Sequence, residues 1–516
     1  MADCLRLSVT CRKTVLRDKS AGDGNFLPLG ASVRSETDSR RDVIGGRRWR
    51  RVFAYAIVAA GSPCRGQIHP GLDPNPASKS PILSIASSLL TILLAVTPIL
   101  AIANGAFAQH AVAIVAAVML AAAAKGAETE LASTAQLLKR FSPAILLPLA
   151  WMVLQTLPLP FPSLANPVWS TTSIALNDPS LPGRISLDPG ATLRCLFLYL
   201  VDVSLVVSTV IITKDRHRAE TVLFVLCAVT TFMSLQGLLG RLDLFAGMIA
   251  DAGGPTSPFP AATALAIVTN GALIARAIER HLHQPDIRNL ASVPLWLGIL
   301  SGLSGIAAAF AAMATFSRGT LLVVTGLGLT VIVFIVAVRR LGFRSWPSAM
   351  LFAVVVAMAG AIALPRVQSG GSGLLGLVSF APEAAALAER VYADASWLGN
   401  GVGTFGLSSR AYQEFGAATL AVPPSTAVLI AIESGRLALV ILAGFAVQLF
   451  FATFRGAVRR GRDSFFASAA AASIVVVLCE SFLDSSLSSP SVQIIVAVMV
   501  GLGLAQSAGR TGGLKR

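Results

Sequence analysis

The amino-acid sequence predicts an all-α protein, a polytopic membrane helix bundle of about twelve transmembrane helices with a large external loop. Composition is the first observation behind this class. Of the 516 residues, 54% are hydrophobic and only 13% are charged, and the mean hydropathy is +0.72. This chain is therefore far more apolar and less charged than a soluble globular chain. The second observation is the recurrence of apolar runs of about 20 residues, the length that crosses about 30 Å of hydrocarbon.

The first 80 residues differ from the rest of the chain. They are polar and Arg-rich, as in RRDVIGGRRWRRV at 40–52, and they lack an apolar period. We predict a mostly disordered cytoplasmic tail at 1–80 and a short cytoplasmic C-terminal tail at 508–516. The apolar patch at 52–64 is too short to span and lacks a signal-peptide cleavage site. An over-extended start site explains segment 1–80 equally well.

The apolar runs place a membrane domain at 81–507. Within it, Gly298, Gly302 and Gly305 have the spacing that lets neighbouring helices approach closely. The predicted spans lie near 82–104, 108–124, 143–162, 192–213, 220–240, 259–278, 291–316, 320–338, 346–364, 436–454, 464–483 and 489–507.

The distribution of Lys and Arg tests this topology, because cytoplasmic loops should carry them. Alternate loops do, and 14 of the 41 basic residues lie before residue 80. The net charge of +15 therefore indicates membrane topology rather than nucleic-acid binding. Both termini are predicted to be cytoplasmic, and the long loops 163–191 and 365–435 external. The basic loops hold Lys125, Lys139, Arg140, Lys214, Arg216, Arg218, Arg276, Arg280, Arg288, Arg339, Arg340, Arg344, Arg455, Arg459, Arg460 and Arg462.

The six cysteines show neither a disulfide framework nor zinc-ligand spacing, so we predict no metal and no cofactor. No external stretch combines sufficient length with an apolar period of its own, which excludes a separate soluble catalytic domain. Any chemistry is therefore expected at a membrane face.

Eight arginines oppose the topological preference, because they fall on the predicted external side. Arginine is favoured over lysine where a planar, permanently charged group binds phosphate or carboxylate with two parallel hydrogen bonds. We therefore predict an anionic substrate, with Arg318, Arg390 and Arg436 around a pyrophosphate. Individual arginines could instead reach lipid headgroups or pair with nearby acids. The eight are Arg184, Arg194, Arg241, Arg318, Arg366, Arg390, Arg410 and Arg436.

The stretch AVPPSTAVLIAIESGRLA at 421–438 predicts a short helix from Pro424 to Ser434, with proline in its first turn and Gly435 as its stop. At about 16 Å the helix is too short to cross the bilayer, so it leads into the span that starts at Arg436. Thr426 and Glu433 are seven residues apart and project from one helix face, where they could contact an acceptor. Glu433 could instead cap the helix or pair with Arg436.

Two further features are a loop and a buried acid. The loop WLGNGVGTF at 397–405 has Gly399, Gly401 and Gly403 at alternate positions but lacks the Gly-Lys-Ser/Thr ending of a Walker loop. It predicts a turn that lies close to the membrane or a ligand. Asp202 lies in the middle of a predicted span, where we expect it to face the bundle interior with a hydrogen-bond or ion-pair partner rather than to couple protons.

Five segments follow one another in a recognisable order: ISLDPGATLRCLFLYL at 185–200, GPTSPF at 254–259, TFSRGTLL at 315–322, the loop at 397–405 and the stretch at 421–438. This order resembles the O-antigen ligase and polymerase family of bacterial inner-membrane glycosyltransferases. The resemblance covers roughly residues 80–507 and implies about twelve helices with a large periplasmic loop. It also implies metal-independent transfer of a glycan from undecaprenyl diphosphate to a lipid A core sugar or a growing chain. Arg318 matches the family arginine of the SRG turn, and Arg390 lies where ligases carry a second one.

The chain is a divergent member by this resemblance. Family ligases carry a histidine, thought to be a general base, followed by a spaced motif that Ser425 and Gly435 fit. Pro424 stands in place of the histidine, and Ala438 occupies the last motif position. Three functions stay open: an O-antigen or exopolysaccharide polymerase-type enzyme working without that histidine, an inactive relative that binds lipid-linked glycan or polysaccharide assembly proteins, and a transporter of a lipid-linked intermediate.

Overall fold

The computed structural model describes residues 81–103, 105–125, 128–242, 256–282, 292–316, 319–341, 382–413, 422–459 and 463–507. All of them belong to one compact unit, Ala77–Arg516. These ranges contain α-helices and two short 3-10 helices, and no strand is found in them. The predicted all-α fold is confirmed. The tail at 1–80, the predicted span at 346–364 and Arg318 lie outside the described residues.

In the described part of the chain, ten helices are long and apolar enough to cross a membrane, and α17 (Ser464–Glu480) is a shorter apolar helix beside them. Together they match eleven of the twelve predicted spans. The ten are α3 (Pro81–Ile102), α4 (Ala106–Ala124), α5 (Glu128–Thr156), α7 (Pro189–Ile212), α8 (Arg216–Arg241), α9 (Phe259–Leu282), α10 (Ser292–Phe316), α11 (Gly319–Leu341), α16 (Arg436–Arg459) and α18 (Pro490–Ser507).

Several predicted span boundaries differ from the helix ends, most of all at the third span, which was expected to start at 143 although α5 starts at Glu128. The third span was expected to run to 162, but α5 ends at Thr156. Pro158, Pro160 and Pro162 follow at alternate positions, and three prolines so close together remove several helix hydrogen bonds in succession, whereas α5 continues through the more widely spaced Pro143 and Pro148. The next span begins at Pro189 rather than 192, because the Asp188 side chain accepts hydrogen bonds from the N–H groups of Gly190 and Ala191 and caps α7. The external loop expected at 163–191 therefore occupies 157–188.

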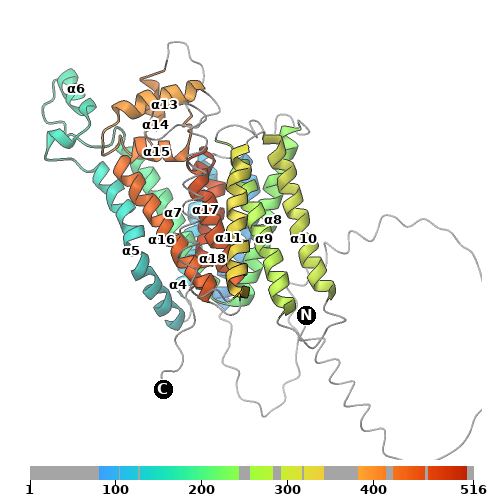
Figure 1. Ribbon diagram of the computed structural model, residues 1–516. Coiled ribbons are helices and arrows are strands. Elements are labelled where there is room, and N and C mark those ends of the chain that lie inside the picture. Colours follow the sequence, from blue (N-terminus) through green and yellow to red (C-terminus); the bar gives the residue numbers. More distant parts are fainter. Residues whose placement is uncertain are drawn as a thin grey trace, which may run out of the picture. The chain divides into compact units, whose positions relative to one another are not determined.

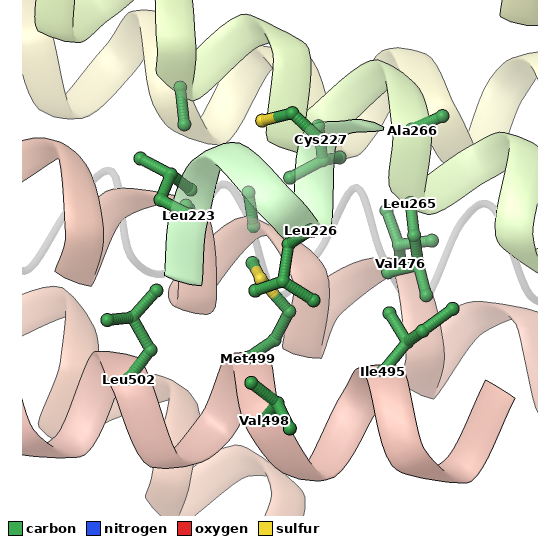
Figure 2. Packing of buried hydrophobic residues seen from close by; sticks show 14 of the residues in the cluster. Leu223, Leu226, Cys227, Leu265, Ala266, Val476, Ile495, Val498, Met499 and Leu502 are labelled. Carbon is green, nitrogen blue, oxygen red and sulfur yellow. The ribbon is translucent and has the colours of Figure 1, made fainter. Parts of the chain in front are cut away.

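The core of the bundle surrounds α9. Of the apolar window of α9, 89% is buried, against 17% for α5 and for α16, which places the latter two at the periphery. Leu226, Leu265, Val476 and Met499 come from α8, α9, α17 and α18 and belong to one buried apolar cluster (Figure 2). The predicted close packing of α10 is confirmed, since a Cβ atom at Gly305 would lie 2.5 Å from the Asn270 side chain on α9.

The two ends of the bundle have different chemistry. At one end, here named the basic end, ion pairs join α8, α9 and α11, and a hydrogen bond from Ser464 of α17 reaches Glu279 of α9. The other end, named the loop end, carries the described short helices α6 (Pro167–Leu176), α13 (Pro382–Asp394), α14 (Phe405–Arg410) and α15 (Thr426–Glu433) (Figure 1). Loops predicted to alternate between the two membrane sides thus lie at opposite ends.

Candidate functional site

The segment 397–405, named the glycine loop, approaches other parts of the backbone very closely. Gly399, Gly401 and Gly403 have φ angles of +81°, +102° and +84°, a region that residues with a side chain rarely adopt. A Cβ atom at Gly399 would lie 2.3 Å from the carbonyl oxygen of Glu433, and one at Gly401 would lie 2.3 Å from the Ser186 hydroxyl. The predicted close approach is confirmed, and what the loop approaches is backbone and side chains of this chain.

Backbone hydrogen bonds connect the glycine loop to two other segments. The N–H groups of Asn400 and Gly401 each donate at 2.9 Å to the carbonyl oxygens of Ile432 and Glu433 at the end of α15. The N–H of Leu187, just before α7, donates to the Asn400 carbonyl at 2.9 Å. The last carbonyl groups of a helix have no partner inside it, so the loop satisfies two of them and fixes α15 beside the start of α7.

Two side chains of α5 hold the same junction. The Gln155 amide donates to the carbonyl oxygens of Leu398 (3.2 Å) and Glu433 (3.1 Å), and its oxygen accepts from the Val402 N–H at 3.3 Å. The Trp151 indole N–H donates to the Ser434 carbonyl at 2.9 Å. Sequence reasoning missed both residues. The one available signal was a glutamine near the end of an apolar span, where an unpaired amide is costly.

The short helix α15 carries the motif positions singled out in the sequence. Ser425 is its N-cap, accepting a hydrogen bond from the Val428 N–H at 3.3 Å. Pro424 is buried and precedes the cap, so the prediction that proline occupies the first turn is wrong. Gly435 has φ +93° and ends the helix as predicted, and α16 begins at Arg436 as expected. Ser425 is thus the N-cap of this helix, and Gly435 directly follows its C-cap, Ser434.

Glu433 is buried at the end of α15, with 6% of its surface exposed. Its Oε1 atom accepts a hydrogen bond from the Phe405 N–H at 3.0 Å. Burial raises the pKa of Glu433 from 4.5 to about 7, and the N–H groups of Gly403 and Phe405 oppose that rise because they stabilise the carboxylate. The carboxylate thus contacts the start of α14, rather than capping its own helix.

A cavity of about 490 Å³ lies at this junction, walled by α4, α5, α7, α15, α16, α18 and the glycine loop. Its lining is mostly apolar, and such volumes are typical of ligand sites. Thr426 and Glu433 both line it, in agreement with the prediction that they share one helix face. Because the peripheral helices α5 and α16 form part of the wall, the cavity lies near the edge of the bundle.

The arginines predicted to bind pyrophosphate do not line this cavity where the structure describes them. Arg390 is exposed on α13. The Arg436 guanidinium lies 4.4 Å from the centre of the Tyr392 ring and 5.0 Å from that of the Trp397 ring, and it donates to the Tyr392 carbonyl at 3.3 Å. These contacts hold α16 against α13 and the glycine loop. A role of Arg318, Arg390 or Arg436 toward pyrophosphate stays a prediction.

Arg194 is a cation that sequence reasoning did not select from the eight. Its guanidinium donates to the Gln109 side-chain oxygen at 2.8 Å, and Gln109 lines the cavity. Arg194 is exposed and lies in the second turn of α7, at the loop end. It thus lies at the rim of the cavity, where its charge is accessible to a ligand.

Asp202 lines the same cavity, farther along α7. We expected a hydrogen-bond or ion-pair partner for it, and within the described ranges its carboxylate has none. The nearby Tyr199 hydroxyl donates instead to the Ile145 carbonyl on α5, at 3.0 Å. The sequence could suggest that Asp202 is buried, but whether a partner helix supplies a donor depends on the packing.

Histidine, cysteine, aspartate and glutamate do not gather into a metal-binding group in the described ranges. The groups of the cavity wall include two carboxylates and a threonine hydroxyl in mostly apolar surroundings, with a guanidinium at the rim. No protein-family model matches this sequence, and no curated protein matches it.

Proposed function

We propose that this multi-pass membrane protein transfers or polymerises a glycan carried on undecaprenyl diphosphate, at the periplasmic face of a bacterial inner membrane, in O-antigen or exopolysaccharide biosynthesis. The observation that carries the proposal is the buried carboxylate of Glu433 in the wall of an apolar cavity at the loop end. A lipid-linked substrate needs both an apolar site for its chain and polar groups where the sugar begins.

The lining of the cavity supports binding of the lipid portion. Leu147 and Met152 of α5 and Leu437 and Ile441 of α16 are among the apolar residues that line it. Each methylene group removed from water contributes about 0.8 kcal/mol, so a few isoprenoid units buried there would hold the carrier. A chain that enters between two peripheral helices would reach the cavity from the bilayer.

Glu433 has the properties of a general base for the transfer. An acceptor hydroxyl would give its proton to the Glu433 carboxylate while its oxygen forms a bond to the anomeric carbon. The bond from that carbon to the diphosphate oxygen breaks, and undecaprenyl diphosphate leaves with the electron pair. A base with a pKa of about 7 is half ionised at neutral pH, which suits proton transfer there. Glu433 would thus take the role of the histidine that Pro424 replaces, and Thr426 would orient the acceptor.

The leaving diphosphate gains negative charge as the glycosidic bond breaks, so a fixed cation near it would lower the barrier. Arg194 at the rim is the described cation that contacts a residue of the cavity wall. We assign it this role beside the three arginines predicted from the sequence, Arg318, Arg390 and Arg436.

The test uses full-length protein in proteoliposomes with an undecaprenyl-diphosphate-linked glycan and a glycan or lipid A core acceptor. Release of undecaprenyl diphosphate and product length are measured. We expect Glu433→Gln to slow release by about 100-fold or more, the usual effect of losing a general base. The matched control is Glu389→Gln, an exposed glutamate of α13, which should leave the rate unchanged. Absence of product from the wild type with every acceptor would contradict the enzymatic proposal.

One observation favours a second candidate, a relative that binds lipid-linked glycan without turnover. Glu433 already accepts backbone hydrogen bonds at the start of α14, a structural role that needs no substrate. In the same proteoliposomes, saturable binding of the lipid-linked glycan without release of undecaprenyl diphosphate would identify this function. Such a non-catalytic protein would be expected to act by associating with polysaccharide assembly proteins.

A further inference from the structure

We propose that the cavity at the loop end also binds a lipophilic organic cation, with the positive charge placed beside Asp202. This site is additional to glycan transfer and does not depend on it. A ligand of this class has an apolar body and one permanent positive charge.

The charges that line the cavity are of one sign. Asp202 and Glu433 both line it, whereas no arginine, lysine or histidine does so in the part of the chain that the structure describes. Arg194 lies outside the lining, and its guanidinium donates a hydrogen bond to the side chain of Gln109. Field lines from a carboxylate are poorly screened in an apolar cavity, so its interior attracts cations and repels anions.

The depth of Asp202 separates it from the rim. It lies thirteen residues beyond the first residue of α7, Pro189, or about 20 Å along the helix. Cys195 marks the level of the glycine loop, since a Cβ atom at Gly403 would lie 2.8 Å from its sulfur. Asp202 lies two helical turns deeper, about 10 Å farther into the bundle. A diphosphate held by Arg194 at the rim and a cation held by Asp202 would therefore occupy different parts of the cavity.

The surroundings of Asp202 leave its carboxylate available. No hydrogen bond or ion pair to it occurs within the described ranges, and Tyr199 directs its hydroxyl to the Ile145 carbonyl. An acid inside a membrane span is costly, so such residues normally face a cavity and meet a proton, an ion or a charged ligand there. The remaining wall supplies apolar contact, including the Trp151 ring, whose face also attracts cations.

The experiment compares two probes of the same shape and opposite charge, tetraphenylphosphonium and tetraphenylborate. Binding of tritium-labelled tetraphenylphosphonium to full-length protein in nanodiscs is measured, and each unlabelled compound is used as competitor. We expect saturable phosphonium binding above that of empty nanodiscs, and tetraphenylborate at least tenfold weaker as competitor. Asp202→Asn should weaken phosphonium binding by about tenfold, equivalent to about 1.4 kcal/mol.

Two further variants keep the test decisive. Asp178→Asn makes the same chemical change on an exposed loop and should leave binding unchanged. Ala438→Trp fills the cavity from α16 while it keeps both carboxylates, and it should abolish phosphonium binding. This variant tests the site independently if Asp202→Asn fails to fold. Equal competition by the two probes would overturn the proposal. Wild-type affinity for the phosphonium in Asp202→Asn or in Ala438→Trp would also overturn it. Because no glycan is present, the result is independent of the glycosyltransferase assay.

Discussion

The acids of the basic end and the acids that line the cavity have opposite surroundings. At the basic end, Glu220 receives hydrogen bonds from Arg216, Arg276 and Arg280, and Glu279 bonds to Arg339 and Ser464. In the cavity wall, Glu433 is bonded to backbone N–H groups, and Asp202, deeper in the bundle, has no partner among the described residues. Glu433 and Asp202 thus face a cavity, whereas Glu220 and Glu279 join helices.

The difference indicates which acids serve stability and which serve ligands. A buried charge that meets several opposite charges is satisfied within the protein, and its loss leaves the partners uncompensated. A carboxylate without a cation keeps its charge, or its proton, for something that enters the site. We therefore assign structural work to the basic end and ligand chemistry to the loop end. The following changes test that division.

The largest expected effect is that of Gly399→Ala. The alanine Cβ would meet the Glu433 carbonyl at 2.3 Å, and φ +81° is unfavourable for any side chain. We expect the free energy of unfolding to fall by about 5 kcal/mol. Most of this loss should appear as easier local opening of the glycine loop. Hydrogen exchange of residues 397–405 and thermal unfolding in detergent measure it. Gly444→Ala, whose Cβ would have no neighbour within 4 Å, is the control, and equal exchange in both variants would contradict the packing described here.

Glu220→Gln comes next. The side chains of Glu220 and Arg276 are only 10% and 11% exposed, so removing the negative charge leaves buried guanidinium groups unpaired. We expect a loss of about 4 kcal/mol in unfolding free energy. Unfolding of the purified variant measures the change.

The control for Glu220→Gln is Asp215→Asn, which weakens a long 3.8 Å contact between Arg218 and an aspartate whose side chain is 45% exposed, and it should cost less than about 1 kcal/mol. Similar stability of the two variants would indicate that the basic end does not depend on its ion pairs.

The third prediction concerns pH and Glu433. Its folded pKa of about 7 lies above the ordinary value of 4.5, so between these pH values the folded state retains a proton that the unfolded state has lost. The contribution of this group to stability is therefore complete below pH 4.5 and is lost as pH rises through 7. Over this pH range the free energy of unfolding should fall by about 3 kcal/mol in total. Unfolding at a series of pH values should show this slope in the wild type and not in Glu433→Gln, and equal slopes would refute the assignment.

The smallest expected effect is that of Arg194→Gln. Arg194 is exposed, and its guanidinium donates one hydrogen bond to Gln109. We expect an affinity for the diphosphate-linked lipid about fivefold lower, or about 1 kcal/mol, with unchanged protein stability. Arg140→Gln on the exposed surface of α5 is the control, and a control as defective as Arg194→Gln would argue for a non-specific charge effect.

The sequence was sufficient for most of the fold because span formation depends on local properties. An apolar run of about 20 residues has few alternatives in a membrane, and the alternation of Arg-rich loops predicted which helix ends lie together. Errors occurred where a local detail decided a boundary, as with the three prolines after Thr156 and the Asp188 cap of α7.

The site was predicted only in part, for a related reason. Helical periodicity placed Thr426 and Glu433 on one face, and alternate glycines predicted a close approach at 397–405. The hydrogen bonds of Gln155, by contrast, join residues 243 and 278 positions apart. Sequence periodicity has no information on such contacts, and the same holds for the contact of Arg194 with α4 and for the missing partner of Asp202.

The most direct test of the division between the two ends compares two glutamate-to-glutamine changes, Glu433→Gln and Glu220→Gln. The measurement is glycan transfer per folded molecule in proteoliposomes, with the folded fraction determined on the same sample. We predict that Glu433→Gln folds and loses transfer by about 100-fold, whereas the folded fraction of Glu220→Gln transfers at the wild-type rate. Wild-type transfer by folded Glu433→Gln would contradict the assignment of ligand chemistry to the loop end.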